Sequence, residues 1–474
     1  MRTIPASLFL GTWLIYLAFL PAGIYSLDGN SMLAVADSLV ARHSVTVPDG
    51  LGALGPDGKT YSTWYPLQSL LAVPVVSIAI VAAHTLHLPD HYVEAMSVLV
   101  LPALYTAATV PLVYLIALQL GSEAFGAWLA ALAYAFGTIA MVYARDFFAE
   151  PLLTLLIAVV LFLAFGNHTK SLWIIAVLSA LTVLAKPTAL LAGPIVSAYL
   201  LARKRSLWLS SLPTIGTAVG FALYCIYNYY RFGNLLQFGK KLEGPALAPS
   251  LSYLPQGIVG QLFSPGAGLF WFCPCVVLAI LGLRRLPPSK LLEALAIISL
   301  FIWFLTVHSL WTFWNGGWSW GPRYLLPALP GLVALTSLTV RKSGKALLAL
   351  GLCGFLLSAP VLVSFVERYL AEANEQGTPV SELLWAPSRS PLVNAWPAAL
   401  REIRDARRHD VRVLFRDRGA PSQTIANSRA LQIVNLWWWV LPVANVPRIF
   451  GIAVSLLLLS AGIWLVMTKG RPSY

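Results

Sequence analysis

Three acidic residues, Asp28, Asp146 and Glu150, occupy positions in which a carboxylate can do chemistry. The chain has only 19 acidic residues among 474. Asp28 closely follows the first apolar run, and the other two lie in the segment YARDFFAEP between two later runs. Because Asp146 and Glu150 are four residues apart, a helical turn would place them on one face. A carboxylate in such a position can act as a general base on a hydroxyl or an amine.

Each of these acids also has a purely structural interpretation. Asp28 can cap a helix that begins near Asn30, since aspartate is a favoured capping residue. Asp146 can pair with a neighbouring arginine, and Glu150 can open a helix because a proline follows it. The expectation that all three face one side of a membrane favours a catalytic role for Asp28 and a second acidic site at Asp146 and Glu150.

Three basic residues, Arg323, Lys186 and Arg145, are candidates for binding a phosphate beside these acids. Arg323 lies in the Gly- and Trp-rich segment WNGGWSWGPRYLLPALP, and a guanidinium can donate two parallel hydrogen bonds to phosphate oxygens. Lys186 interrupts the apolar stretch 172–202, where an ionisable group is costly and indicates function. Pro187 predicts a helix break that brings Lys186 to the outer interface; a lysine that merely snorkels there is the alternative.

The composition indicates an integral membrane protein. The chain is 58% hydrophobic and 11% charged, with a mean hydropathy of +0.74, whereas soluble domains are about 25% charged. Apolar runs long enough to cross a bilayer recur along the chain. Because these runs are continuous and do not alternate with period two, they predict helices and an all-α fold. The net charge of +13 indicates basic cytoplasmic loops, and no nucleic-acid-binding motif accompanies it.

The distribution of basic residues predicts the topology. Clusters that face the cytoplasm under the positive-inside rule lie at 203–205, 284–290, 341–345 and 469–471. Four apolar runs separate residue 26 from the inside loop at 167–171, although an odd number of crossings is required. The run 66–88 contains two prolines and ends among histidines, so we expect it to lie on the outer face. About twelve transmembrane helices result, with juxtamembrane helices in the first outer loop.

Three regions follow from this topology. Residues 1–366 form the membrane domain, with the first outer loop at 26–93. Residues 367–447 form an outer loop or small domain, and residues 448–474 form the final transmembrane helix and a cytoplasmic tail. Within the outer region, WPAALREIRDARRHD (396–410) predicts a charged amphipathic helix and VRVLF (411–415) predicts a strand.

The order of several motifs resembles that of the C-type glycosyltransferase superfamily, which uses polyprenyl-phosphate sugars and includes aminoarabinose transferases and protein O-mannosyltransferases. The resemblance covers roughly residues 1–345. The motifs that carry it are, in order, SLDGNSMLAVADSLV, YSTWYPLQSLLAVP, RDFFAEPLLTLL, AKPTALLAGP and GGWSWGPRYLLPALP. Each motif is loose by itself, and their order is the stronger signal.

The resemblance implies specific roles for residues already singled out. It implies that Asp28 is the catalytic acid/base-type residue, that Asp146 or Glu150 fills a second acidic position, and that Arg323 belongs to the donor-phosphate site. Many relatives carry an acidic pair at the first motif, whereas Gly29 follows Asp28 here. Some relatives also place a lysine where this chain has a tryptophan and Tyr65.

Three further residues are site candidates. Lys59 and Tyr65 lie near the place of the relatives' lysine, and His308 lies at the outer end of an apolar run, where it is a candidate for proton transfer. The sequence identifies no certain cofactor. The sequence leaves open whether a divalent metal joins the acids, and three histidines at 84, 87 and 91 are a weak alternative zinc site.

The expected function is inverting-type transfer of a sugar from a polyprenyl-phosphate carrier to an unidentified glycan, lipid or protein acceptor. We expect it at the extracytoplasmic face of a bacterial-type plasma membrane, with membrane lipid and the carrier as partners and no nucleic acid. A transporter or flippase for a lipid-linked saccharide is the alternative, in which Lys186 and Glu150 would be coupling groups. An assembly protein whose outer region binds a partner is a third.

Overall fold

The computed structural model describes residues 3–166, 171–237, 249–317, 319–364, 366–406 and 434–469. Helices make up nearly all of the regular structure in these residues. The strands among them are β1 (Ala53–Leu54) and β2 (Thr60–Tyr61), which pair as a short antiparallel hairpin. Continuous apolar runs satisfy their backbone groups within each helix, and the prediction of an all-α protein is confirmed.

The N-terminal part consists of a bundle helix, a helical segment at residues 27–98 and a second bundle helix. We call residues 27–98 the outer segment after their expected position. α1 (Thr3–Ala18) packs against α5 (Val100–Gln119). Between them in sequence, α2 (Leu27–Arg42) packs against α3 (Pro66–Leu86), which packs against α4 (Asp90–Val98). Helices are therefore present where the first outer loop was expected, and their position beside the membrane stays a prediction.

The centre of the molecule is a bundle whose buried side chains form one large hydrophobic cluster. Within this bundle, α5 contacts both α6 and α8, and α9 packs along α11. The helices are α6 (Ala124–Gly137), α7 (Ala140–Tyr143), α8 (Ala149–Phe165), α9 (Ser171–Ala185), α10 (Ala192–Ala202), α11 (Leu207–Phe232), α13 (Leu254–Phe263), α14 (Leu269–Phe272), α15 (Val277–Leu283), α16 (Leu291–Ser309), α17 (Leu329–Thr336) and α18 (Val340–Ser358).

The region after α18 is also helical where it is described. α19 (Val366–Glu375), α20 (Val380–Trp385) and α21 (Pro391–Ala406) precede α24 (Arg448–Trp464), which packs against α1. The helix predicted over 396–410 is confirmed as far as Ala406. The strand predicted at 411–415 lies outside the described residues.

Six helical stretches are long and apolar enough to cross a membrane: Pro66–Leu86, Asp90–Gln119, Leu207–Phe232, Pro288–Ser309, Arg323–Leu362 and Arg448–Thr468. Shorter apolar helices of 10–17 residues accompany them: Thr3–Ala18, Ala124–Gly137, Ala149–Phe165, Ser171–Ala185, Pro187–Ala202 and Pro274–Leu283. Length and composition do not distinguish a spanning α3 from one that lies on the surface. The outer placement of residues 66–88 and the number of twelve spans therefore stay predictions.

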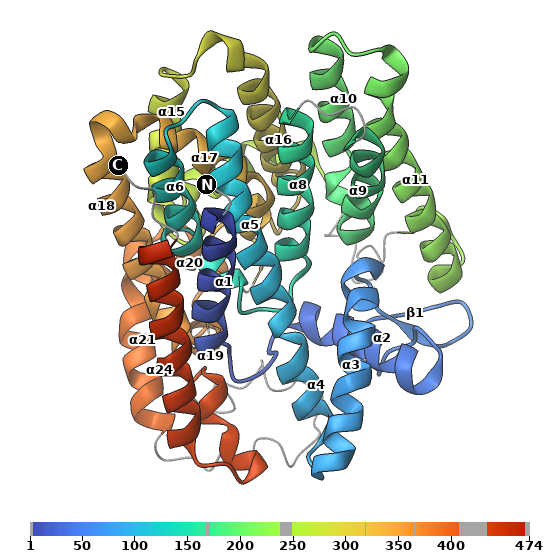
Figure 1. Ribbon diagram of the computed structural model, residues 1–474. Coiled ribbons are helices and arrows are strands. Elements are labelled where there is room, and N and C mark those ends of the chain that lie inside the picture. Colours follow the sequence, from blue (N-terminus) through green and yellow to red (C-terminus); the bar gives the residue numbers. More distant parts are fainter. Residues whose placement is uncertain are drawn as a thin grey trace.

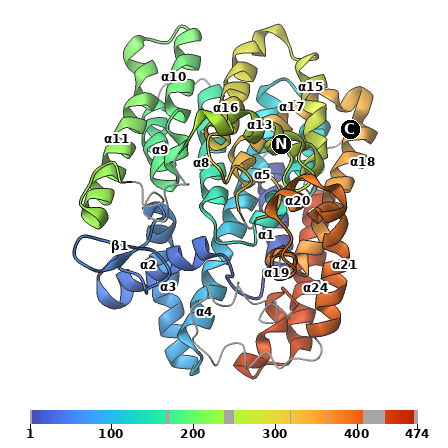
Figure 2. The same cartoon turned by 180° about the vertical axis from the view of Figure 1, so that it is seen from behind.

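The outer segment lies beneath one group of bundle helices. Both ribbon views show α9, α10 and α11 together above α2, α3 and the hairpin, while α18, α21 and α24 lie on the opposite side (Figures 1 and 2). α9 ends at Ala185, and the 3₁₀ helix η1 (Pro187–Ala189) follows. The helix break predicted at Pro187 is confirmed, and it leaves Lys186 at a junction between two helices.

Candidate active site

Asp28 lies in the first turn of α2, and it is not the capping residue. The N-cap is Ser26, whose hydroxyl oxygen accepts a hydrogen bond of 3.2 Å from the backbone N–H of Gly29. The helix begins at Leu27, so the interpretation of Asp28 as a cap for a helix that starts near Asn30 is wrong. With its capping role taken by Ser26, the carboxylate of Asp28 is available for another partner.

That partner is Arg323, which begins the 3₁₀ helix η6 (Arg323–Ala328). Its Nη1 donates to Oδ2 of Asp28 at 2.9 Å, across 295 residues of sequence. Its Nη2 donates to the carbonyl oxygen of Gly316 at 3.1 Å, and its guanidinium lies 4.2 Å from the centre of the Phe148 ring. Gly316 has a φ of 84°, a conformation that glycine adopts readily, so this turn can present its carbonyl to the arginine.

Glu150 and Lys186 complete the cluster of charged groups. The Lys186 ammonium lies 2.7 Å from Oε1 of Glu150, and both side chains are almost fully buried. The Nε of Arg323 lies 3.5 Å from the same oxygen but makes no hydrogen bond. We call Asp28, Glu150, Lys186 and Arg323 the charged cluster; it holds two acids and two cations. The structure thus brings together four of the predicted site residues from four separate segments.

Asp146 lies beside this cluster in the turn between α7 and α8. Its Oδ1 accepts a hydrogen bond of 3.2 Å from the hydroxyl of Ser26, the residue that caps the helix of Asp28. Burial is the main cause that raises the pKa of Asp146 to about 7; the Ser26 hydrogen bond and Arg323 act against this rise, and the nearby Asp28 carboxylate adds to it. Asp146 therefore holds its proton more tightly than an exposed aspartate does.

Arg145 is not brought into the charged cluster. Its buried guanidinium donates to the backbone carbonyls of Phe19, Val361 and Asn435. These three carbonyls come from widely separated parts of the chain, so Arg145 joins the end of α1 to two C-terminal segments. The geometry supports a structural role for this residue and offers nothing for phosphate binding.

An aromatic wall borders the lysine of the cluster. The Lys186 ammonium lies 4.3 Å from the centre of the Tyr324 ring. The His308 ring stacks on the same tyrosine, with ring centres 4.3 Å apart and an interplanar angle of 12°. The Nδ1 of His308 lies 2.9 Å from the carbonyl oxygen of Phe304, while its buried Nε2 has no partner among the described residues. His308 is therefore close to the cluster and retains one free ring nitrogen.

Of the two remaining candidates, Tyr65 is near the cluster and Lys59 is not. Burial raises the pKa of the Tyr65 hydroxyl well above its usual value, with further contributions from Tyr224, Tyr324, Glu150 and Asp28. Lys59 lies beside the β1–β2 turn, where its exposed ammonium is 3.6 Å from a carboxylate oxygen of Asp57.

The histidines considered as a metal site do not form one. His84 pairs with Asp90 at 3.5 Å on the surface. In the part of the chain that the structure describes, no group of three or more His, Cys, Asp or Glu side chains is arranged to hold a metal ion.

Sequence reasoning missed two aromatic contacts and the role of Arg231. Tyr324 and Phe148 each follow a charged motif residue closely in sequence, and this adjacency was the available signal. Arg231 is fully buried and donates to the carbonyls of Ser62 and Trp64, which fastens α11 to the segment before α3. A lone arginine at a helix end gives no such indication in the sequence.

The sequence matches no family model, and no curated protein is significantly similar to it. The structure is similar to two crystal structures of ArnT from Cupriavidus metallidurans. The form bound to undecaprenyl phosphate matches with a TM-score of 0.54 over 98% of this chain and 77% of that chain, at 15% identity. The apo form matches with a TM-score of 0.51 over 95% and 75%, at 16% identity. This chain has the ArnT fold.

The fold that the resemblance implies is thereby confirmed. An oligosaccharyltransferase from Archaeoglobus fulgidus matches more loosely, with a TM-score of 0.43 over 90% of this chain and 60% of that chain at 12% identity. Within the ArnT fold, the charged cluster lies where α2, α8, η1 and η6 meet.

Proposed function

We propose that this protein transfers a sugar from a polyprenyl-phosphate carrier to an acceptor at the extracytoplasmic face of a membrane. The observation that carries the proposal is the charged cluster, in which a carboxylate on α2 faces an arginine and a lysine from distant segments. The ArnT fold adds support, because one of the similar structures is described as bound to undecaprenyl phosphate. The inverting outcome and the outward orientation are part of the proposal.

In the proposed reaction, Asp28 acts on the acceptor. Its carboxylate takes the proton from the acceptor hydroxyl or amine while that atom forms a bond to the anomeric carbon. The bond from the anomeric carbon to the phosphate oxygen breaks, and its electron pair stays on the carrier phosphate. Attack from the side opposite the leaving phosphate inverts the anomeric centre.

Arg323 and Lys186 stabilise the charge that develops on the leaving phosphate. Positioned donors act most strongly where charge appears during the reaction. Both cations are already balanced by acids: Arg323 by Asp28, and Lys186 by Glu150. When the donor phosphate occupies the site, it takes over a share of these donors and leaves the Asp28 carboxylate free to accept a proton. Because its pKa is raised to about 7, Asp146 is only partly ionised near neutral pH and repels the donor phosphate less than a fully ionised aspartate would.

The test is an Asp28→Asn variant, reconstituted in proteoliposomes with a polyprenyl-phosphate sugar and assayed by mass spectrometry for the freed carrier. We expect transfer to fall at least a hundredfold, because general-base catalysis contributes about 10²–10⁴. Asp37→Asn is the matched control, since Asp37 lies on the same helix and makes only a loose 4.0 Å contact with Arg42.

Full transfer by the Asp28→Asn variant would remove Asp28 from the mechanism. Movement of the lipid-linked sugar across the membrane without any transfer would favour a flippase. Labelling of a cysteine placed at Lys59, on the same outer segment as α2, checks the orientation: modification from the cytoplasmic side alone contradicts the proposed face.

A further inference from the structure

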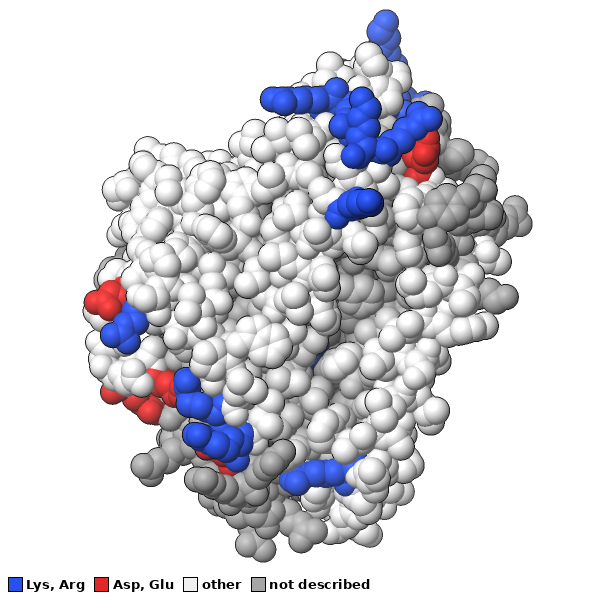
Figure 3. Space-filling view, turned by 90° about the vertical axis from the view of Figure 1, so that its left-hand side faces the viewer, with Lys and Arg blue, Asp and Glu red and all other residues white. Residues whose placement is uncertain are grey.

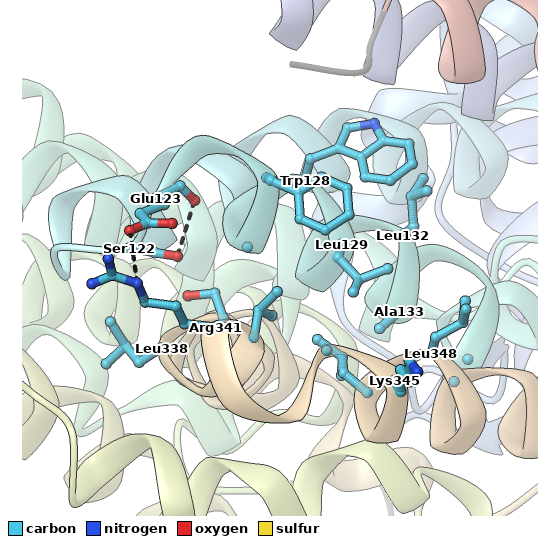
Figure 4. A pocket seen from close by; sticks show the side chains of 18 of the residues that line it. Ser122, Glu123, Trp128, Leu129, Leu132, Ala133, Leu338, Arg341, Lys345 and Leu348 are labelled. Carbon is cyan, nitrogen blue, oxygen red and sulfur yellow. Dashed lines mark hydrogen bonds and ion pairs between the residues drawn. The ribbon is translucent and has the colours of Figure 1, made fainter. Parts of the chain in front are cut away.

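A cavity of about 1180 Å³ lies between α6 and α18. None of its lining residues belongs to the charged cluster. Figure 4 shows side chains of both helices facing the space between them, with Leu129 and Leu132 on α6 opposite Leu348 on α18. The volume is above the roughly 300–1,000 Å³ typical of sites for small molecules. We call this space the α6–α18 groove.

The two helices meet closely at the far end of the groove. A Cβ atom on Gly137 would lie 2.7 Å from the Cα of Gly351, so a larger residue at position 137 would not allow this approach. From Glu123 to Phe136 the lining follows α6 for about 20 Å at 1.5 Å per residue. One leaflet of a bilayer accounts for about half of its 30 Å hydrocarbon core, or about 15 Å. The apolar wall is therefore longer than one leaflet and shorter than the whole hydrocarbon core.

The other end of the groove is basic. Its lining contains a single acid, Glu123, and four cations: Arg285, Arg341, Lys342 and Lys345. The contact of Arg341 with Glu123 is long, at 3.7 Å, and both side chains are largely exposed, so this pair is weak. Figure 3, which faces the side of the molecule that carries α18, shows basic side chains gathered at one end above a wide uncharged band.

We propose that the α6–α18 groove binds an anionic membrane phospholipid. Its phosphate lies among Arg341, Lys342 and Lys345, and one acyl chain follows the apolar walls toward Phe136. Basic pockets between transmembrane helices attract anionic headgroups, and the net charge of the groove's lining is positive by three. Walls of about 20 Å fit an acyl chain, whereas a polyprenyl chain longer than these walls would extend beyond the groove.

The test compares lipids that remain bound to the purified full chain in native mass spectrometry. The probes are phosphatidylglycerol, phosphatidylcholine with the same acyl chains, and a polyprenyl phosphate. We expect Lys342→Gln/Lys345→Gln to weaken phosphatidylglycerol binding roughly twentyfold, since each cation near a membrane surface contributes about fivefold. Lys204→Gln/Arg284→Gln is the matched control, because it removes two exposed cations that do not line the groove.

Equal retention of phosphatidylglycerol and phosphatidylcholine, or a double variant that binds like the unchanged protein, would overturn headgroup recognition. Tighter binding of the polyprenyl phosphate than of phosphatidylglycerol would overturn the choice of occupant. Leu348→Trp tests the acyl-chain part with every charge in place, because Leu348 lines the groove and is 61% exposed. We expect this variant to lose bound phosphatidylglycerol; retention at the original affinity contradicts the position of the chain.

Discussion

Replacement of Glu150 by glutamine should destabilise the protein through the charge that it leaves behind. The carboxylate lies 2.7 Å from the Lys186 ammonium and 3.5 Å from the Arg323 guanidinium. The side chains of Lys186 and Glu150 are only 7% and 4% exposed. Removal of one partner from a buried pair costs about 3–5 kcal/mol, because the remaining charge has no compensation and no water. We expect a loss of that size for Glu150→Gln.

A second variant separates this cause from a simple loss of packing. Glu150→Gln/Lys186→Met removes both charges and keeps most of the side-chain volume, so we expect it to recover most of the lost stability. Glu293→Gln is the matched control, because Glu293 is equally buried but its partners Arg203 and Lys290 are 35% and 29% exposed and can turn to water. Its expected cost is smaller, about 1 kcal/mol.

The free energies of unfolding can be measured by titration of purified protein in detergent with sodium dodecyl sulfate. The reasoning fails if Glu150→Gln costs no more than Glu293→Gln. It also fails if the double variant is less stable than the single variant. In that case the loss of stability would come from the missing attraction within the ion pair and not from a lysine charge left unpaired. Sugar transfer by the double variant should stay low, because Lys186 is proposed to bind the donor phosphate.

Three further predictions concern the residues around the cluster. Arg323→Lys keeps the charge but loses the two separate hydrogen bonds of the guanidinium to Asp28 and Gly316. We expect kcat/KM for the donor to fall about 10²–10³-fold, which is the usual effect of losing one donor that stabilises developing charge. A fall of less than threefold, or an equal fall in the control Arg203→Lys, contradicts this expectation. Asp146 binds its proton in the folded state up to about pH 7, against an ordinary value of 3.8, so between these values the unfolded state binds fewer protons and stability should decline as pH rises. The contribution of Asp146 to this slope is at most about 1.4 kcal/mol per pH unit, and the slope should become smaller by that contribution in Asp146→Asn when unfolding is followed from pH 4 to 8; an unchanged slope refutes the raised pKa. Arg145→Met removes the donor to three backbone carbonyls, so the free energy of unfolding should fall by several kcal/mol. The KM of the folded fraction for the sugar donor should stay unchanged. A large rise in this KM would support a role for Arg145 in binding the donor phosphate.

Local features of the fold followed from local sequence. The helix break at Lys186 and Pro187 was predictable because proline lacks the N–H that a continuing helix needs. The helix after Asp28 was also expected, but its cap was misassigned, since Ser26 and Asp28 are both favoured capping residues and only backbone geometry distinguishes them. The amphipathic helix that ends at Ala406 was predictable from its charged and apolar periodicity.

Candidate residues could be chosen from the sequence, but their partners could not. An ionisable residue in an apolar run is costly wherever the chain goes, so Lys186 attracts attention by position alone. Nothing in the sequence pairs it with Glu150, 36 residues away, in preference to Asp28. The same reasoning did not find the partners of Arg145, because an arginine beside two motif acids gives no indication that its donors meet backbone carbonyls.

The amino-acid sequence by itself determined the all-helical class, the helix break and the residue types available for chemistry, because each depends on the properties of a short segment. The tertiary structure decided which of these residues meet: Asp28 and Arg323 are 295 residues apart in sequence and 2.9 Å apart in space. It also produced the α6–α18 groove, which requires two helices from distant segments to converge at Gly137 and Gly351. Such contacts depend on how whole helices pack, and packing is a property of the assembled fold.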